Sequence, residues 1–202
     1  GSQTTLDLYY WNNNTQTNTW SESLLNKINL NINFINNIGT TWASKIATTK
    51  WKAGGNTWNN ISDSIPSVAY INEIISPITT NTTDNASEYS AKIGLAYASD
   101  YGFAADPSAW ITSLTYYRDK GEDGIVLSTT NWMYMDFYEW LISRDADNSD
   151  SVFAIYDGGR VYGNKVDEYF GVRVAFNLEP SVTYVSGSGT MSDRVRDRKS
   201  VV

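Results

Sequence analysis

Apolar residues near the N-terminus recur at spacings of three and four, which is the period of an amphipathic helix. The pattern predicts a helix over residues 20–38, with Thr19 or Ser21 as its N-cap and Gly39 as its C-terminal stop. Its apolar face is expected to contain Leu24, Leu25, Ile28, Ile32, Ile35 and Ile38. The N-terminal part of the chain should therefore pack through one face of this helix.

Short elements separated by turn residues are predicted over the next hundred residues. The first group consists of a second short helix (41–47), a strand (50–53) ending in a turn at Gly54 and Gly55, a loop (56–66), a helical turn (69–75) ended before Pro77, and a polar loop (79–87). The second group consists of a strand (92–98), a turn (99–102), a helix (107–114) and a surface loop (118–124).

The last third of the chain carries a strong β pattern. Residues 152–156 alternate, Asp157 and Gly158 are typical of a type I′ hairpin turn, and residues 159–162 return as the second strand. Apolar and polar residues then alternate strictly over 172–178, which predicts a strand with one apolar face. This region should therefore form a hairpin followed by a strand.

Length and charge narrow the function classes. A chain of 202 residues is long enough for one well-buried domain, divided here into an N-terminal helical part (1–55), an α+β core (56–185) and a flexible tail (186–202). Its net charge of −7 repels phosphate backbones, and no apolar run is long enough to span a bilayer. We expect no nucleic-acid partner and no direct membrane insertion by this fragment.

The absence of cysteine and histidine excludes several catalytic and metal chemistries. Thiol catalysis, thiolate metal sites and Ser-His-Asp triads all need one of these residues. Carboxylates remain, and Glu139 with Asp136 or Asp145 is a candidate acid pair for a glycoside hydrolase. Carboxylates close in sequence are common on polar surfaces, so we favour a protein without catalytic residues and keep the hydrolase as an alternative.

Two acidic segments resemble calcium loops only in part. Asp145, Asp147 and Ser149 alternate as calcium ligands do, but Asp150 stands where an EF-hand requires glycine. The acidic segment near Asp123 lacks the closing glutamate, because Thr130 takes its place. We expect no cofactor, and a lectin-type calcium site that includes Asp145 and Asp147 is the alternative.

Aromatic residues crowd the segment 131–144. We expect Trp132 and Trp140 to pack in the core, as large rings usually do, and Tyr134 and Tyr138 to lie at the surface as ligand contacts. The low charge and many Asn, Thr, Ser and Tyr residues are typical of a protein exposed at a cell wall.

An ordered set of motifs resembles uncharacterised surface proteins of Firmicutes and Mollicutes, some of which carry a pilin-like helix. The set comprises Trp51-Lys52-Ala53-Gly54-Gly55, Lys92-Ile93-Gly94-Leu95, Ser99-Asp100-Tyr101-Gly102, Asn131-Trp132, Glu139-Trp140, Ser143-Arg144 and Gly171-Val172-Arg173. The order is also similar to that in the C-type lectin-like fold of formylglycine-generating-enzyme relatives and of diversity-generating-retroelement variable proteins.

The resemblance implies an α+β, C-type lectin-like fold in which N-terminal amphipathic helices pack on small antiparallel sheets, with a C-terminal hairpin plus strand. Formylglycine generation needs cysteine and does not transfer. The pattern departs from the family at Val174, where proline is usual, and after Asp193. Residues 197–202 back-translate to a sequence that looks like a sequencing adapter, so we expect that they are not native.

The hairpin region yields the binding hypothesis. If Phe153, Ile155 and Val161 point inward with Val172 and Phe176, the alternating residues face outward. The resemblance implies that such residues contact ligand in the retroelement-diversified proteins. The expected ligand contacts on the hairpin and following loop are Tyr156, Arg160, Tyr162, Asn164, Asp167 and Tyr169.

We therefore expect an extracellular adhesion-type module on a bacterial cell surface, which binds a glycan or a protein on another cell or host surface. Besides the hydrolase, the alternative is a minor-pilin or cell-wall scaffold head without a dedicated ligand.

Overall fold

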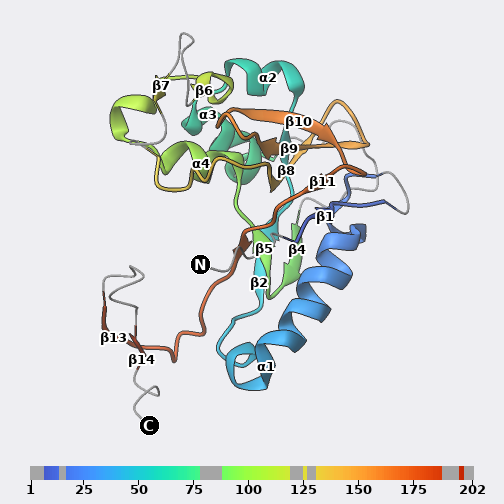
Figure 1. Cartoon of the computed structure of the whole chain (residues 1–202), viewed down its shortest axis with the longest axis vertical. Helices are drawn as coiled ribbons and strands as arrows, with labels where there is room; N and C mark the ends of the chain where they lie inside the picture. Colours follow the sequence, from blue (N-terminus) through green and yellow to red (C-terminus); the bar gives the residue numbers. More distant parts are fainter. Residues whose placement is uncertain are drawn as a thin grey trace.

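The computed structural model describes residues 7–13, 17–77, 88–118, 125–126, 131–187 and 196–197. Short helices and several small sheets give the chain a mixed α+β architecture, which confirms that fold class. Figure 1 shows a long N-terminal helix, in blue, leading to α1 at one end of the molecule, while α2, α3 and α4 gather at the opposite end. The predicted loop at 79–87 lies outside the described residues, as does nearly all of the one at 118–124.

The elements are short apart from the N-terminal helix and the central strands. The helical segments are η1 (Trp20–Glu22), η2 (Leu25–Phe34), α1 (Ile35–Ala43), α2 (Trp58–Asp63), α3 (Pro66–Tyr70), η3 (Ile71–Ile75), α4 (Ala98–Phe103), η4 (Pro107–Ala109) and η5 (Leu114–Tyr116). The strands are β1 (Tyr9–Tyr10), β2 (Thr49–Lys52), β3 (Gly55–Asn56), β4 (Glu88–Ala91), β5 (Gly94–Leu95), β6 (Tyr117–Arg118), β7 (Ile125–Val126), β8 (Glu139–Asp145), β9 (Ser151–Ile155), β10 (Val161–Lys165), β11 (Tyr169–Phe170), β12 (Val174–Ala175), β13 (Tyr184–Ser186) and β14 (Arg196–Asp197).

The N-terminal helix forms where predicted, but its buried face differs from the prediction. Ile28 and Ile32 are 42% and 47% exposed, whereas Leu25 and Leu30 are buried and Ile35 packs against the same core. The reason is that η2 is a π-helix, whose hydrogen bonds join residues five apart. Leu25, Leu30 and Ile35, which are five residues apart, therefore share the buried face. The prediction had placed residues three and four apart on that face.

Gly39 interrupts this helix as predicted. Its φ of 79° and ψ of 162° break the helical backbone, which resumes only as far as Ala43. A positive φ of this size costs glycine little and other residues more. The predicted second helix thus exists but ends earlier than residue 47.

The centre of the fold is a four-stranded sheet in the order β10-β9-β8-β3. Every residue of β8 and β9 is buried, because each face of the sheet contacts a separate apolar core. Trp140 and Val152 belong to one core, while Leu141 and Phe153 belong to the other. Successive side chains of a strand point to opposite faces, so this sheet separates the two cores.

The predicted hairpin is confirmed, but its turn differs. β9 and β10 pair antiparallel with Ile155 opposite Val161. The amide of Gly159 donates to the carbonyl of Tyr156 at 2.7 Å, and Gly159 carries a φ of 90°. A turn closed by a left-handed glycine is a three-residue hairpin loop with a bulge, and it replaces the expected two-residue type I′ turn at Asp157 and Gly158.

The long strand predicted over 172–178 is wrong. Only β12 (Val174–Ala175) forms, opposite β5, and Leu178 adds a single bridge to Ile46. Phe176 is 43% exposed, and Val172 packs against the core opposite to that of Phe153. Alternation alone does not make a strand when the neighbouring strand is only two residues long.

The neighbouring strand β5 ends at Leu95, and the helix α4 begins at Ala98. The predicted strand over 92–98 is reduced to β5, and the predicted turn over 99–102 is the helix α4. The amide of Tyr97 donates to Oδ2 of Asp100 at 3.0 Å, which satisfies a free donor at the helix start.

The segment after β2 also differs from the prediction. Gly54 and Gly55 do not form a turn, because Gly55 enters β3 and pairs parallel with Arg144 of β8. A Cβ on Gly55 would lie 2.0 Å from the carbonyl oxygen of Arg144, so only glycine permits this approach. The segment over 56–66, expected to be a loop, contains the helix α2. The pairing of β3 with β8 sets the direction in which the chain enters this segment.

Two further helix predictions have opposite outcomes. The helical turn over 69–75 is confirmed and starts earlier, at Pro66, a residue suited to the first helical turn. The predicted helix over 107–114 is wrong, because only the 3-10 turns η4 and η5 form there. The carboxylate of Asp106 accepts from the amide of Ser108 at 2.9 Å, a local bond that favours a tight turn.

Candidate functional site

Most of the predicted hairpin residues meet in one cluster. The rings of Tyr156 and Tyr162 pack edge to face with centroids 5.5 Å apart, and the ring of Tyr138 lies 4.8 Å from that of Tyr156. The guanidinium carbon of Arg160 lies 5.1 Å and 4.9 Å from the Tyr156 and Tyr162 centroids, within cation–π range. The hairpin platform is defined here as Trp58, Tyr138, Tyr156, Arg160, Tyr162 and Asn164.

Specific contacts hold the platform side chains in place. Nδ2 of Asn164 donates to the hydroxyl of Tyr156 at 2.6 Å, and the ring of Tyr162 lies 4.2 Å from that of Trp58. Burial raises the pKa of Tyr156, while the hydrogen bond from Asn164 acts in the opposite direction. A Cβ on Gly163 would come within 2.8 Å of the Trp58 ring, so glycine lets Trp58 lie across β10. The platform is therefore fixed before any ligand arrives.

The platform is half-buried at the protein surface. Tyr138 is 37% exposed, and Tyr156, Arg160, Tyr162 and Asn164 are all partly exposed. Val161, between Arg160 and Tyr162, is fully buried in the core. The strand alternation thus places the polar and aromatic residues as predicted, although they are less exposed than free surface side chains.

Tyr134 supports the hairpin loop from its side. Its hydroxyl lies 2.6 Å from the carbonyl oxygen of Asp157 and 2.9 Å from Oδ1 of Asp136. Asp136 itself has a φ of 55°, a conformation that aspartate tolerates better than most residues. Tyr134 therefore ties the 134–136 segment to the hairpin turn.

Asp167 and Tyr169 form a second group with the N-terminal strand. Tyr169 pairs with Tyr10 across β11 and β1, their ring centroids are 4.0 Å apart, and their hydroxyls are hydrogen-bonded. Asp167 is exposed near the same ring. Phe170 follows Tyr169, and its ring centroid lies 5.0 Å from that of Tyr138. The strand β11 therefore lies between the hairpin platform and this second group.

The two tryptophans predicted to be core residues have different positions. Trp140 is fully buried, but Trp132 is 78% exposed. Asn131 explains the difference, because its Nδ2 donates to the carbonyl of Tyr101 at 2.8 Å and its Oδ1 accepts from the amide of Met133 at 2.9 Å. These bonds fix a turn that directs Met133 inward and Trp132 outward.

The three candidate acids for hydrolysis differ in burial and in partners. Glu139 is 2% exposed, and its Oε2 forms an ion pair with Arg173 at 2.8 Å. Burial raises the pKa of Glu139, and the positive charge of Arg173 opposes that shift. Asp145 is also buried, while Asp136 is exposed and hydrogen-bonded to Tyr134. None of these three acids is among the residues that line the hollow described below.

The candidate calcium residues have structural partners. Oδ1 of Asp145 accepts from the amide of Asp147 at 2.9 Å, and burial raises the pKa of Asp145. Asp147 is exposed. Within the described parts of the chain, no three acidic side chains come together as a group that could hold a metal ion.

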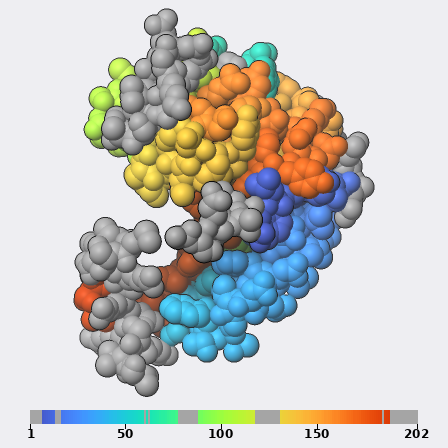
Figure 2. Space-filling model, in the orientation of Figure 1, coloured from blue at the N-terminus to red at the C-terminus, as the bar shows by residue number. Residues whose placement is uncertain are grey.

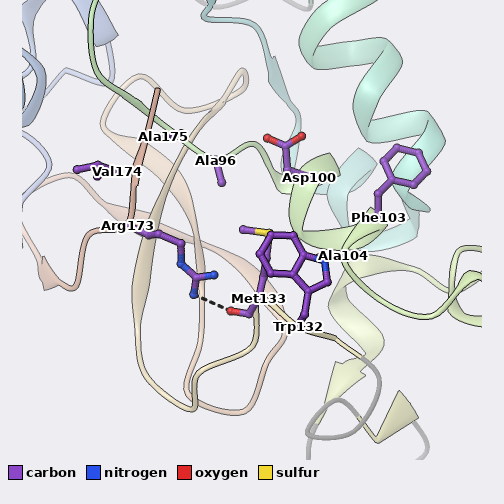
Figure 3. Close-up of a pocket in the computed structure, with 9 residues that line it drawn as sticks. All are labelled: Ala96, Asp100, Phe103, Ala104, Trp132, Met133, Arg173, Val174 and Ala175. Carbon is purple, nitrogen blue, oxygen red and sulfur yellow. Dashed lines mark hydrogen bonds between the residues drawn. The ribbon is translucent and has the colours of Figure 1, made fainter. Parts of the chain in front are cut away.

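A hollow that the sequence did not indicate lies between α4 and β12. Its volume is about 560 Å³, and Figure 3 shows Trp132, Asp100 and Arg173 among the side chains that line it. The residues that line this hollow, called the Trp132 pocket below, are Ala96, Asp100, Phe103, Ala104, Trp132, Met133, Arg173, Val174 and Ala175. The only sequence signal was the presence of several of these residues in the quoted motifs.

Comparisons with known proteins do not place this chain in a family. No protein-family model matches the chain, and no curated protein or solved structure is similar to it. Across the described ranges, every helix is too short or too polar to cross a lipid bilayer.

Proposed function

We propose that this chain is a non-catalytic binding module, displayed outside a bacterial cell, that holds a protein ligand on the hairpin platform. The finer fold in this proposal is C-type lectin-like, supported by the ordered motifs and by a hairpin stacked on a mixed α+β core. The observation that carries the proposal is the arrangement of Arg160 against both Tyr156 and Tyr162 at a partly exposed surface.

Tyrosine and arginine are the residues most often found at the energetic centres of protein interfaces. Large rings bury much area at a small entropy cost, and the contacts with Asn164 and Trp58 reduce that cost further. The platform lies at the edge strand β10 of a sheet whose inner strands β8 and β9 are buried, so a ligand would meet side chains that are backed by core.

A glycan is the second candidate ligand, because the exposed indole of Trp132 beside a hollow is suited to a sugar ring. The two ligand classes use different residues and can be tested separately. No observation favours the scaffold head or the hydrolase over binding.

The platform is tested by screening the chain against arrays of host and bacterial surface proteins. A protein bound by the wild type should bind the Arg160→Ala variant at least about tenfold more weakly. Arg160→Lys should also weaken binding, because lysine keeps the charge but loses the planar group that stacks on the rings.

The matched control is Trp42→Ala, which removes a 63% exposed ring from α1, at the end of the molecule opposite the hairpin (Figure 1). This variant should bind as the wild type does. Equal binding by Arg160→Ala would assign the ligand to another surface, and a wild type that binds no protein would favour the scaffold alternative.

A further inference from the structure

Trp132 presents an exposed indole from a rigid turn beside the pocket. Its amide donates to the carbonyl of Ala104 at 3.3 Å, and Asn131, which precedes it, pairs with Ala105 in a β-bridge. The indole is nevertheless 78% exposed. A large ring held out of the core by a fixed backbone contributes little to packing, so its position requires another explanation.

Two charged groups flank this indole with hydrogen-bonding capacity to spare. Asp100 accepts from the amide of Tyr97 through Oδ2. Arg173 donates through Nη2 to the carbonyl of Met133 at 2.6 Å and to Glu139 at 2.8 Å. Among the described residues, Oδ1 of Asp100 and both Nη1 and Nε of Arg173 have no hydrogen-bond partner. Both residues line the pocket, and Figure 3 shows them on separate segments of the chain near Trp132.

Glu139 positions Arg173 for this role. The buried carboxylate holds Nη2, so the rest of the planar guanidinium is directed rather than mobile. The ion pair also neutralises Arg173, and Asp100 then leaves the pocket with a net negative charge. An anionic ligand is disfavoured by that charge and by the net charge of −7 on the whole chain. The net charge would attract a cation, but an ammonium only donates hydrogen bonds and cannot accept one from Arg173.

The geometry points to a neutral pyranose ring, the terminal hexose of a glycan, as the ligand of the Trp132 pocket. Its apolar face would stack on the indole of Trp132, one hydroxyl would donate to Asp100 and another would accept from Arg173. Hydroxyls can do both, which neither an ammonium nor a carboxylate can. A volume of about 560 Å³ lies within the range of small-molecule sites, and apolar walls with a few convergent polar groups are typical of them.

This site shares no residue with the hairpin platform, and the inference rests on the second candidate function, a glycan ligand, for which it names the sugar class and the contacts. The experiment is saturation-transfer NMR on the full chain with glucose, galactose, mannose and N-acetylglucosamine as separate probes. At least one sugar should show transfer, and Trp132→Ala should weaken its affinity by about tenfold or more. Trp132→Phe should restore part of the affinity, because it restores an aromatic face.

The polar contact is tested with Asp100→Asn. Asparagine keeps an oxygen that can accept from the amide of Tyr97 and so preserves the start of α4, but it removes the acceptor that faces the pocket. The same sugar should bind this variant several-fold more weakly. Trp42→Ala and Arg160→Ala should bind it as the wild type does, which separates this pocket from the platform.

Three outcomes would overturn the proposal. The first is the absence of transfer to all four neutral sugars. The second is transfer that survives in Trp132→Ala. The third is selective binding of glucuronate or of protonated glucosamine, which would replace the neutral ligand by a charged one.

Discussion

The carboxylate of Glu73 lies 2.5 Å from the hydroxyl of Ser143, in the space between η3 and the central strand β8. Glu73 is fully buried and also accepts from the amide of Ser99 at 3.2 Å and from Nδ2 of Asn56 at 3.2 Å. Four segments, η3, β3, α4 and β8, therefore meet at the Glu73 carboxylate. Burial raises the pKa of Glu73 to about 7, the hydrogen bonds oppose that rise, and nearby Asp100 adds to it.

This pKa makes stability depend on pH. Between an unfolded pKa of about 4.5 and the folded value of about 7, the folded chain holds more protons, so the free energy of unfolding should fall as pH rises through that window. The loss from this group is at most about 3 kcal/mol and is complete above pH 7. Urea unfolding at pH 5 and pH 8 measures it.

The control for that prediction is Glu73→Gln, which has nearly the same shape and no charge. Its oxygen can accept from Ser99 and its amide can donate to the hydroxyl of Ser143, while Nδ2 of Asn56 loses its acceptor at both pH values. As pH rises from 5 to 8, the free energy of unfolding of the wild type should fall, and that of the variant should fall less. Parallel stability profiles for the two proteins would show that Glu73 does not titrate in this range.

Removing one partner of the ion pair between Arg173 and Glu139 should lower the free energy of unfolding more than removing both partners. Arg173→Ala would leave the Glu139 carboxylate buried without its counter-charge, which costs about 3–5 kcal/mol for a buried pair. Adding Glu139→Gln to that variant should recover much of the loss, because the uncompensated charge is removed. Chemical denaturation of both variants and of Glu139→Gln alone completes the cycle, and additive losses would refute the coupling.

The register of the π-helix can be tested with two substitutions two residues apart. Leu30→Ala removes a side chain that is 4% exposed and should cost about 2–5 kcal/mol. Ile32→Ala removes one that is 47% exposed and should cost about 0.5 kcal/mol or less. Thermal unfolding distinguishes them. An ordinary helical spacing, which would bury Ile32, predicts a large loss for Ile32→Ala as well.

The parallel pairing of β3 with β8 depends on a missing side chain. A Cβ on Gly55 would meet the backbone of Arg144 at 2.0 Å, so Gly55→Ala should separate the strands and cost about 1–3 kcal/mol or more. Gly158 in the hairpin loop is the matched control, because a Cβ there meets nothing within 4 Å. Gly158→Ala should change the unfolding free energy by about 0.5 kcal/mol or less. Similar melting temperatures for both variants would contradict the pairing.

Local chemistry allowed part of the fold to be predicted from the sequence. The hairpin of β9 and β10, the break at Gly39 and the helical segment before Pro77 each depend on residues close in the chain. The outward position of Tyr156, Arg160 and Tyr162 followed from strand alternation. These features need no knowledge of distant contacts.

The features that failed depend on partners far away in the sequence. The strand over 172–178 is reduced to the two residues that pair with β5, and Gly55 became a strand residue because Arg144 lies beside it. Trp132 is exposed because Asn131 bonds to Tyr101, thirty residues earlier. The Trp132 pocket likewise exists only where α4, the turn at Trp132 and β12 converge.

By itself, then, the sequence determined the α+β class, the hairpin with its aromatic residues, the helix break at Gly39 and the end of the helical segment before Pro77. The tertiary structure decided which face of the N-terminal helix is buried, which tryptophan is exposed and which carboxylates are paired. The physical reason is range: turns, caps and alternation act over a few residues, whereas burial, ion pairing and cavities arise only when segments distant in the chain are packed together.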